Sequence, residues 1–232
     1  MLSNENIKVT AIIAAGGSGM RMNAEIPKQF IYIHNKPIII HTLEKFAGCA
    51  RVHKILLVVP GNELEEAVLL VEKWNITKPT KVVAGGKTRQ HSVWNGLNTI
   101  SDNTDIVIVH DGVRPFISEE IITACIEETH KWGAVITAVP VTDTVKEVID
   151  HTVRRTLERS KLWSVQTPQG FKKGLLTEAY NKAWESNLTA TDDSTLVENI
   201  GHTVRVIQGA EKNIKITSPE DLRIAENLLE DV

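Results

Sequence analysis

The sequence predicts an α/β fold: a doubly wound, mostly parallel sheet with helices on both faces and a protruding β-hairpin arm. Two observations indicate the sheet. Short runs of β-branched and aliphatic residues alternate with longer segments of helical periodicity, and several of these runs are continuously apolar. Continuous apolar runs are typical of strands buried on both faces, and strand–helix alternation is typical of parallel sheets with right-handed crossovers. The segment 145–157 interrupts the alternation and indicates the arm.

The first strand is expected at 9–15, where a continuous apolar run ends in glycines. Pro37 opens a helix at 38–46, because proline is favoured in the first turn. A second helix is expected between Leu64 and Trp74, where apolar residues recur at helical spacing. The other strands of this half are expected at 54–59, 81–84 and 105–109.

In the second half, Ser118 can cap a helix with Glu119 and Glu120 in its first turn, where the helix dipole favours carboxylates. A similar start, with Ser218 as the cap and Pro219 in the first turn, predicts the last helix. Between these two starts we expect a helix from about 172 and strands at 134–139, 203–207 and 213–217.

The interrupting segment contains two β-prone runs, 145–149 and 152–157, separated only by Asp150 and His151. Two residues can join antiparallel strands but cannot form the crossover between parallel strands, so the segment should be a β-hairpin. An isolated two-stranded hairpin is marginally stable in water. We therefore expect it to pack on its own domain or to embrace a second subunit.

The composition indicates one folded, soluble, cytoplasmic domain over residues 1–232. Hydrophobic residues make up 42% and charged residues 24% of the chain, as in ordinary globular proteins. A formal net charge of −3 gives no support to a nucleic-acid binder with a basic surface, and two cysteines exclude a disulfide framework and suit a reducing compartment. The apolar runs are far shorter than the roughly 20 residues of a membrane helix, and the N-terminus shows no signal pattern. We expect neither nucleic acid nor a membrane as a partner.

A glycine-rich loop after the first strand carries the strongest functional signal. It runs from Ala14 through Gly16 and Gly17 to Arg21, and Lys28 follows shortly after. A buried strand that enters such a loop places backbone N–H groups at the carboxyl edge of a parallel sheet, where α/β folds bind ligands. The loop can cradle phosphates, to which Arg21 and Lys28 add positive charge. The alternative is a tight turn with two solvated basic residues.

Two common glycine-loop motifs do not fit. A dinucleotide fingerprint would need glycine at Met22 and an acidic residue about 20 positions later, where His34-Asn35-Lys36 stands. A P-loop ending in Gly86-Lys87-Thr88 would need glycine at Lys81. Both motifs are excluded.

Asp111 comes just after a buried strand, in a segment that continues to Arg114 and Pro115. An aspartate there can hold Mg²⁺ coordinated to substrate phosphates, or it can bond its own backbone in a turn. Lys215 is expected near the end of the strand at 213–217. Other candidates, each of which could also be an ordinary loop or capping group, are Asp143-Thr144, Arg159, Thr167-Pro168-Gln169 and Thr191-Asp192-Asp193.

These segments, together with three further motifs, resemble a known family. The further motifs are Gly85-Gly86-x-x-Arg89-x-x-Ser92, Asp143-Thr144-x-Lys146 and Asn213-Ile214-Lys215-x-Thr217-x-Pro219-Glu220-Asp221-Leu222. In order and residue type, the set is similar to the 2-C-methyl-D-erythritol 4-phosphate cytidylyltransferases of the nonmevalonate isoprenoid pathway. The resemblance runs from Ala14 to Leu222, and Met20 departs from it, since family members often carry a second basic residue there.

The resemblance implies a Rossmann-like nucleotidyltransferase fold that transfers CMP from CTP to 2-C-methyl-D-erythritol 4-phosphate and releases pyrophosphate. Arg21 and Lys28 would stabilise the transition state, and Arg159 and Lys215 would position the attacking phosphate. Residues 141–160 would form an arm exchanged between the subunits of a homodimer. The residues that the resemblance assigns to substrate binding are Ala14, Ala15, Gly16, Gly17, Gly86, Ser92, Asp111, Arg114, Thr144, Thr167 and Thr191.

The resemblance also implies Mg²⁺ bound by Asp111. Three other functions stay open: a cytidylyltransferase acting on ribitol 5-phosphate, a sugar-1-phosphate nucleotidyltransferase using UTP or GTP, and a nucleotide-binding regulatory module without catalysis. The presence of Arg21, Lys28 and Lys215 argues against the last, because a chain that had lost catalysis would be free to lose them.

Overall fold

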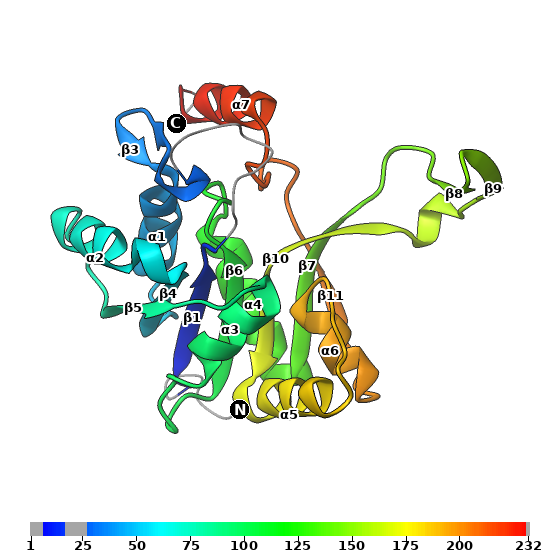
Figure 1. Cartoon of the computed structure of the whole chain (residues 1–232). Helices are drawn as coiled ribbons and strands as arrows, with labels where there is room; N and C mark the ends of the chain where they lie inside the picture. Colours follow the sequence, from blue (N-terminus) through cyan, green and yellow to red (C-terminus); the bar gives the residue numbers. More distant parts are fainter. Residues whose placement is uncertain (1–6, 17–26, 231–232) are drawn as a thin grey trace.

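The computed structural model describes residues 7–16 and 27–230, which form a central sheet with helices on both faces (Figure 1). The seven strands of this sheet lie in the order β11-β7-β10-β6-β1-β4-β5. They are β1 (Val9–Ala14), β4 (Lys54–Val59), β5 (Thr80–Ala84), β6 (Ile106–Asp111), β7 (Ala134–Pro140), β10 (Trp163–Lys172) and β11 (Arg205–Gln208). The helices are α1 (Ile38–Gly48), α2 (Leu64–Lys73), α3 (Arg89–Leu97), α4 (Glu119–Trp132), α5 (Lys173–Glu185), α6 (Asp193–Asn199) and α7 (Pro219–Glu230). Two short hairpins pair β2 (Tyr32–Ile33) with β3 (Lys36–Pro37), and β8 (Lys146–Ile149) with β9 (Thr152–Thr156).

The sheet is mostly parallel and doubly wound, as expected. β1 pairs in parallel with β4 on one side and with β6 on the other, whereas β10 runs antiparallel between β6 and β7. The chain therefore moves from β1 to β4 and β5 and then returns to β6 on the opposite side of β1. At this reversal Ala14 lies opposite Asp111, so the carboxyl ends of β1 and β6 adjoin. Open α/β sheets bind their ligands at such a reversal.

A separate layer of helices covers each face of the sheet (Figure 1). Ala11 and Ile13 of β1 pack in one cluster with residues of α1, α2 and α4. Ile12, between them, packs in a second cluster with residues of α3, α5 and α6. Side chains of successive strand residues point to opposite faces, so both faces of β1 are buried and the strand is apolar throughout.

Most expected elements are confirmed, with bounds within two residues of those expected. The Ser118 hydroxyl caps α4 by accepting a hydrogen bond from the N–H of Ile121. The expected strand at 213–217 is wrong, because this segment is a loop. Its Ile216 N–H donates to the Val113 carbonyl, and its side chain is buried with Ala225 of α7. The apolar residues of this loop are explained by burial against the segment between β6 and α4, and not by pairing in the sheet.

Among the strands of the central sheet and the α-helices, three were not expected: β10, α3 and α6. β10 contains Pro168 and Gly170, which are unfavourable inside strands. Glycine fits at 170 because α4 packs closely there: a Cβ atom would lie 2.1 Å from Thr129 Oγ1 and 3.0 Å from Cys125 Sγ. α6 has seven residues, which is too short for a clear helical period.

The β8–β9 hairpin projects away from the central sheet (Figure 1). Asp150 and His151 both have positive φ, as a tight two-residue hairpin turn requires. Val148, Ile149 and Val153 on this arm are 54%, 50% and 56% exposed. Of the two arrangements expected for the hairpin, packing on its own domain is therefore not what the chain adopts.

We predict that Gly170→Ala lowers the free energy of unfolding by about 1–3 kcal/mol, because the added methyl group overpacks the contact between β10 and α4. Urea unfolding measures the change. Gly174→Ala in α5 is the matched control: outside its own turn of helix and its chain neighbours, nothing lies within 4 Å of its Cβ position, so alanine should be neutral or stabilise by up to about 1 kcal/mol. Equal stability of both variants would contradict the close packing at Gly170.

Candidate active site

Two adjoining cavities lie at the carboxyl ends of β1 and β6. The first, of about 370 Å³, lies between the end of β1, the 3₁₀ turn Lys28–Phe30 and the start of α3. The second, of about 410 Å³, lies between β10 and the start of α6. Arg89, Asp111 and Lys215 line both cavities. These three side chains therefore form the boundary between them.

Most of the residues that the sequence indicated line these cavities. Those at the first cavity are Ala14, Ala15, Gly16, Lys28, Ser92, Asp111 and Lys215. Those at the second cavity are Asp111, Arg114, Thr167, Thr191 and Lys215. Gly17 and Arg21 lie outside the described residues. The sheet reversal thus brings together segments from the first and last quarters of the chain.

Ser92 lines the first cavity and is held by the glycine pair before α3. Gly86, which the sequence assigned to substrate binding, itself lines neither cavity. The Ser92 hydroxyl accepts a hydrogen bond from the Gly86 N–H at 3.1 Å and donates to the Thr88 carbonyl at 2.9 Å. A Cβ at Gly85 would lie 2.7 Å from Ser92 Oγ, and one at Gly86 would lie 2.4 Å from His91 Cβ. A larger residue at either glycine would therefore displace Ser92 or His91 at the start of α3.

Asp111 is the charged centre of the site. Its Oδ1 lies 3.2 Å from Arg89 Nε, and its Oδ2 lies 2.9 Å from Lys215 Nζ and 3.5 Å from Arg114 Nε. Burial by itself would raise the pKa of this carboxyl group, but the positive charges of Arg89 and Lys215 outweigh burial and hold the pKa far below its usual range. Asp111 is therefore a carboxylate at every physiological pH.

A buried asparagine fixes the loop that carries Lys215. The Asn213 side-chain amide donates to the Thr167 carbonyl at 2.8 Å and to Gln166 Oε1 at 3.2 Å. The Arg114 guanidinium donates to the Asn213 carbonyl at 2.7 Å. Lys215 thus reaches the site from a loop bonded to β10 and Arg114, rather than from the strand that the sequence predicted.

The far side of the second cavity is built on β10 and α6. The Thr167 hydroxyl accepts a hydrogen bond from the Asp111 N–H at 3.1 Å, which holds β10 against the end of β6. Asp192 caps α6 by accepting from the Thr195 N–H at 3.1 Å, and it also accepts from the Gln169 amide at 2.8 Å. These bonds fix Thr191 at the cavity edge.

Positive charge predominates around the two cavities. Among their described lining residues, the basic ones are Lys28, Lys87, Arg89, Arg114 and Lys215. The acidic ones are Asp111, Asp192 and Glu198. Since Asp111 already neutralises much of the nearby charge, the remaining excess suits a ligand with several phosphate groups.

Thr144 and Arg159 do not line either cavity of their own chain. Thr144 is exposed where the chain enters the arm. Arg159, in the short 3₁₀ turn that follows the β8–β9 hairpin, donates to the Thr142 carbonyl at 2.7 Å. Within one chain, the arm residues indicated by the sequence are therefore separate from the other site residues.

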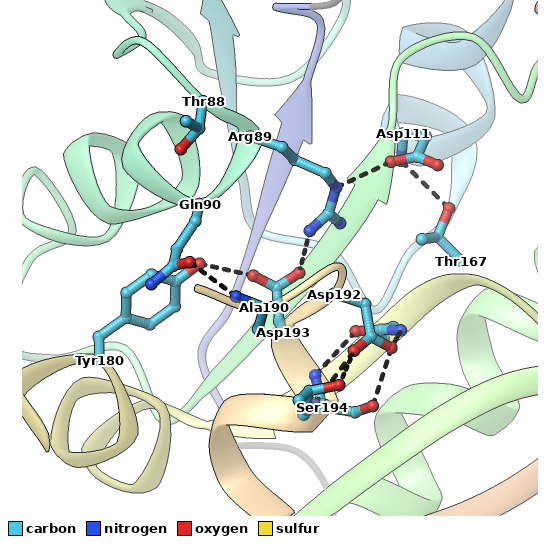
Figure 2. Close-up of polar contacts among 12 residues, drawn as sticks. Thr88, Arg89, Gln90, Asp111, Thr167, Tyr180, Ala190, Asp192, Asp193 and Ser194 are labelled. Carbon is cyan, nitrogen blue, oxygen red and sulfur yellow. Dashed lines mark hydrogen bonds and ion pairs between the residues drawn. The ribbon is translucent and has the colours of Figure 1, made fainter. Parts of the chain in front are cut away.

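Arg89, Asp193 and Tyr180 are absent from the residues that the sequence assigned to the site, although all three belong to its polar network (Figure 2). Arg89 could have been recognised as a site residue, because it belongs to the motif Gly85-Gly86-x-x-Arg89-x-x-Ser92. Asp193 belongs to a candidate segment, Thr191-Asp192-Asp193, whose residues could equally be loop or capping groups. Tyr180 gives no signal in the sequence, since a tyrosine in a helix is usually part of the core.

Among the described lining residues, Asp111 is the one carboxylate shared by both cavities, whereas Asp192 and Glu198 line the second cavity alone. The described residues contain no group of three or more His, Cys, Asp or Glu side chains placed to share an ion. Asp111 faces both cavities, and Mg²⁺ in nucleotide sites is commonly bound by one or two carboxylates plus substrate phosphates and water. The donor set therefore fits an Mg²⁺ ion that arrives with a nucleotide, and it does not fit a cage made by protein alone.

A larger cavity, of about 790 Å³, lies at the opposite edge of the sheet, near the amino end of β6. Two of its acidic side chains already have partners: Asp102 pairs with Lys173 at 3.1 Å, and Asp105 accepts from the backbone N–H of Lys8 at 2.7 Å. It also lies at the amino rather than the carboxyl ends of the strands, so its size does not make it the better site.

No helix in the described part of the chain combines the length and the apolar character needed to cross a membrane.

The fold and the paired cavities define an α/β protein of the nucleotidyltransferase type. A family model described as 2-C-methyl-D-erythritol 4-phosphate cytidylyltransferase matches residues 9–231. The chain belongs to this family of cytidylyltransferase enzymes, which confirms the resemblance inferred from the sequence.

Individual relatives agree with the family model over nearly their whole lengths. The chain is 46% identical to the 2-C-methyl-D-erythritol 4-phosphate cytidylyltransferase of Alkaliphilus metalliredigens, covering 96% of this chain and 93% of the relative. It is 45% identical to that of Syntrophus aciditrophicus, with 96% of each covered. A crystal structure of 4-diphosphocytidyl-2C-methyl-D-erythritol synthase from Anaerococcus prevotii superposes with a TM-score of 0.87 at 33% identity, covering 97% of this chain and 100% of that one.

Proposed function

We propose that the chain transfers CMP from CTP to 2-C-methyl-D-erythritol 4-phosphate and releases pyrophosphate. The observation that carries this proposal is the pair of cavities that meet at Asp111, Arg89 and Lys215 in a chain of this family. One cavity has the glycine-lined, basic wall suited to a nucleotide. The other offers threonine hydroxyls and Lys215 to a phosphorylated polyol.

The chemistry requires no general base. A phosphate monoester has a second pKa of about 6, so the attacking phosphate is largely dianionic at neutral pH. The obstacle is the repulsion between this dianion and the nucleotide triphosphate. The protein therefore acts by positioning the substrates and by electrostatic stabilisation, as is usual in enzymes that transfer phosphoryl groups.

Four basic residues, Arg21, Lys28, Arg114 and Lys215, have roles in this scheme. Lys28 lines the first cavity, and with Arg21 it would stabilise the charge that develops at the α-phosphate and the leaving pyrophosphate. Lys215 lines both cavities, so it would bind the attacking phosphate beside the nucleotide. Arg114 would support Lys215 through its bond to the Asn213 carbonyl.

Asp111 would hold Mg²⁺ together with oxygens of the nucleotide. When bound, the ion would screen the charge of the triphosphate. The Asp111 carboxylate is pre-ionised for this role, and its bond through the backbone N–H to Thr167 fixes its position relative to the second cavity.

We further propose that the chain works as a cytoplasmic homodimer. The arm leaves three apolar side chains about half exposed, and it carries Thr144 and Arg159 away from the cavities of its own chain. An arm that packs on a second copy would bury these apolar groups and bring Arg159 to the partner's acceptor cavity. Both cysteines, Cys49 and Cys125, are free and buried, which suits a reducing compartment.

A pyrophosphate-release assay tests the reaction directly. Four nucleoside triphosphates are crossed with methylerythritol phosphate and ribitol 5-phosphate as acceptors. We expect release with CTP and methylerythritol phosphate. Preference for ribitol 5-phosphate, or for UTP or GTP, would contradict the assigned substrates, and the absence of release with every pair would contradict catalysis.

We predict that Lys28→Ala and Arg21→Ala each lower kcat by about two or more orders of magnitude, because each removes a cation from the place where negative charge develops. Steady-state kinetics at saturating substrates measure the loss. Lys54→Ala, which removes an exposed lysine at the amino end of β4, is the matched control and should retain wild-type kcat. A variant that keeps more than about a tenth of wild-type kcat would remove that residue from transition-state stabilisation.

Asp111→Asn should raise the Mg²⁺ concentration needed for half-maximal activity roughly tenfold or more, because an amide is a poorer ligand for a hard cation than a carboxylate. The measurement is a Mg²⁺ titration at fixed CTP. Asp102→Asn removes one negative charge near the opposite end of the same strand and should leave the titration unchanged. The metal role of Asp111 is wrong if both variants titrate like the wild type.

Arm exchange predicts complementation between inactive variants. Arg159→Ala should abolish activity, and mixing it with Lys28→Ala should restore it, because one site of each heterodimer contains both wild-type residues. Random pairing of equal amounts makes about half of the dimers hybrid, each with one intact site of two, so recovery of roughly a quarter of wild-type activity is the ceiling.

The control mixture combines Lys28→Ala with Lys215→Ala. Both residues line the same cavity of one chain, so neither site of that heterodimer is intact and the mixture should stay inactive. If the subunits demonstrably exchange and the Arg159→Ala mixture also stays inactive, Arg159 does not act across the subunit boundary.

A further inference from the structure

Asp193 is a buried carboxylate that belongs to neither cavity wall. Its side chain is 1% exposed. Its Oδ2 accepts from Arg89 Nη1 at 2.7 Å, and its Oδ1 accepts from the Tyr180 hydroxyl at 2.6 Å (Figure 2). Both carboxylate oxygens therefore face charged or polar partners outside the backbone of α6.

These contacts do not serve to start the helix. Asp192, the preceding residue, is the residue that caps α6. α6 is also anchored by Leu196 and Val197, which are buried in the core. The carboxylate of Asp193 is thus available to act on Arg89.

Arg89 is divided between two carboxylates. Its Nη1 bonds to Asp193, while its Nε lies 3.2 Å from Asp111 Oδ1. Burial disfavours the charge of Arg89, but the two carboxylates more than compensate and raise its pKa above the usual range. The guanidinium is a planar, permanently charged group, so these two bonds fix its orientation at the boundary between the cavities.

We propose that Asp193 is a positioning residue that holds Arg89 in this orientation and thereby keeps Asp111 available to the nucleotide and to Lys215; this rests on the proposed function. Without the Asp193 charge, Arg89 would turn both of its donor groups onto Asp111, since guanidinium and carboxylate groups favour bidentate pairing. It would then compete for Asp111 Oδ2, which Lys215 and Arg114 now share.

Tyr180 extends this support into the core. Its ring stacks on Trp94 of α3, with ring centroids 5.5 Å apart, and its hydroxyl reaches Asp193. α3 carries Arg89 at its first position. The Tyr180 side chain therefore ties the helix that carries Arg89 to the carboxylate that orients it.

The test measures binding of CTP in the presence of Mg²⁺ by calorimetry. We expect Asp193→Asn to weaken binding roughly tenfold or more, as the loss of a hydrogen bond to a charged group implies. Tyr180→Phe, which keeps the ring and removes one hydrogen bond, should weaken binding in the same direction by a smaller factor. It also keeps the test decisive if Asp193→Asn does not fold.

Val197→Ala is the control for a merely structural effect. It removes a buried contact of the same helix without touching Arg89, so it should lower the unfolding temperature and leave CTP binding unchanged. A second comparison uses Arg89→Met: adding Asp193→Asn to this variant should cause no further loss, because the group that Asp193 positions is gone.

Wild-type-like CTP binding by Asp193→Asn and Tyr180→Phe, or weakening that Val197→Ala matches at equal loss of stability, would overturn the inference. Additive losses for Arg89→Met and Asp193→Asn would do the same. These outcomes differ from failure of the proposed function, in which the wild-type chain itself would not bind CTP; that result would overturn both.

Discussion

The ion cluster around Asp111 is the constraint on which the rest of the site depends. A carboxylate placed at the end of a central strand is largely removed from water, and an unpaired charge there would be costly. Arg89, Arg114 and Lys215 neutralise it from three different segments of the chain. The start of α3, the turn after β6 and the loop before α7 must therefore converge on one point.

This convergence explains why the site consists of two cavities rather than one. Arg89, Asp111 and Lys215 stand at the boundary, with the end of β1 and the 3₁₀ turn Lys28–Phe30 on one side and β10 and α6 on the other. The antiparallel β10 is essential to this arrangement, because it brings the Thr167 hydroxyl beside the Asp111 N–H. Two reacting anions can then be held close together while the same group of charges lies between them, which suits the positioning role proposed for the protein.

The parts of the fold and site that depend on residues close in sequence could be predicted from the sequence. The apolar run of β1 and the placement of Asp111 at the carboxyl end of β6 follow from strand burial and sheet topology. β10 was missed because its Gly170 is favourable only against α4, which the strand's own sequence does not show. Lys215 was expected on the wrong element, yet it lies at the site because Asn213 and Ile216 anchor its loop. The pair Arg89 and Asp193 spans 104 positions, so no local motif could reveal it.

The arm lacks a packing surface and the second cavity lacks Arg159, and a dimer that exchanges arms would supply both. The arm has apolar side chains that its own chain leaves exposed, and an isolated two-stranded hairpin gains little stability from its own contacts. The second cavity has Lys215 and threonine hydroxyls for an acceptor phosphate, whereas Arg159 lies on the chain segment at the base of the arm. Under the proposed dimer, a two-fold axis applies the same contact twice, so each arm would gain a packing surface and each cavity an arginine. In the proposed dimer, Val148, Ile149 and Val153 would be buried against the second subunit, which explains their exposure in a single chain. The free energy gained by burying them would hold the arm in place, and with it Arg159 at the acceptor site.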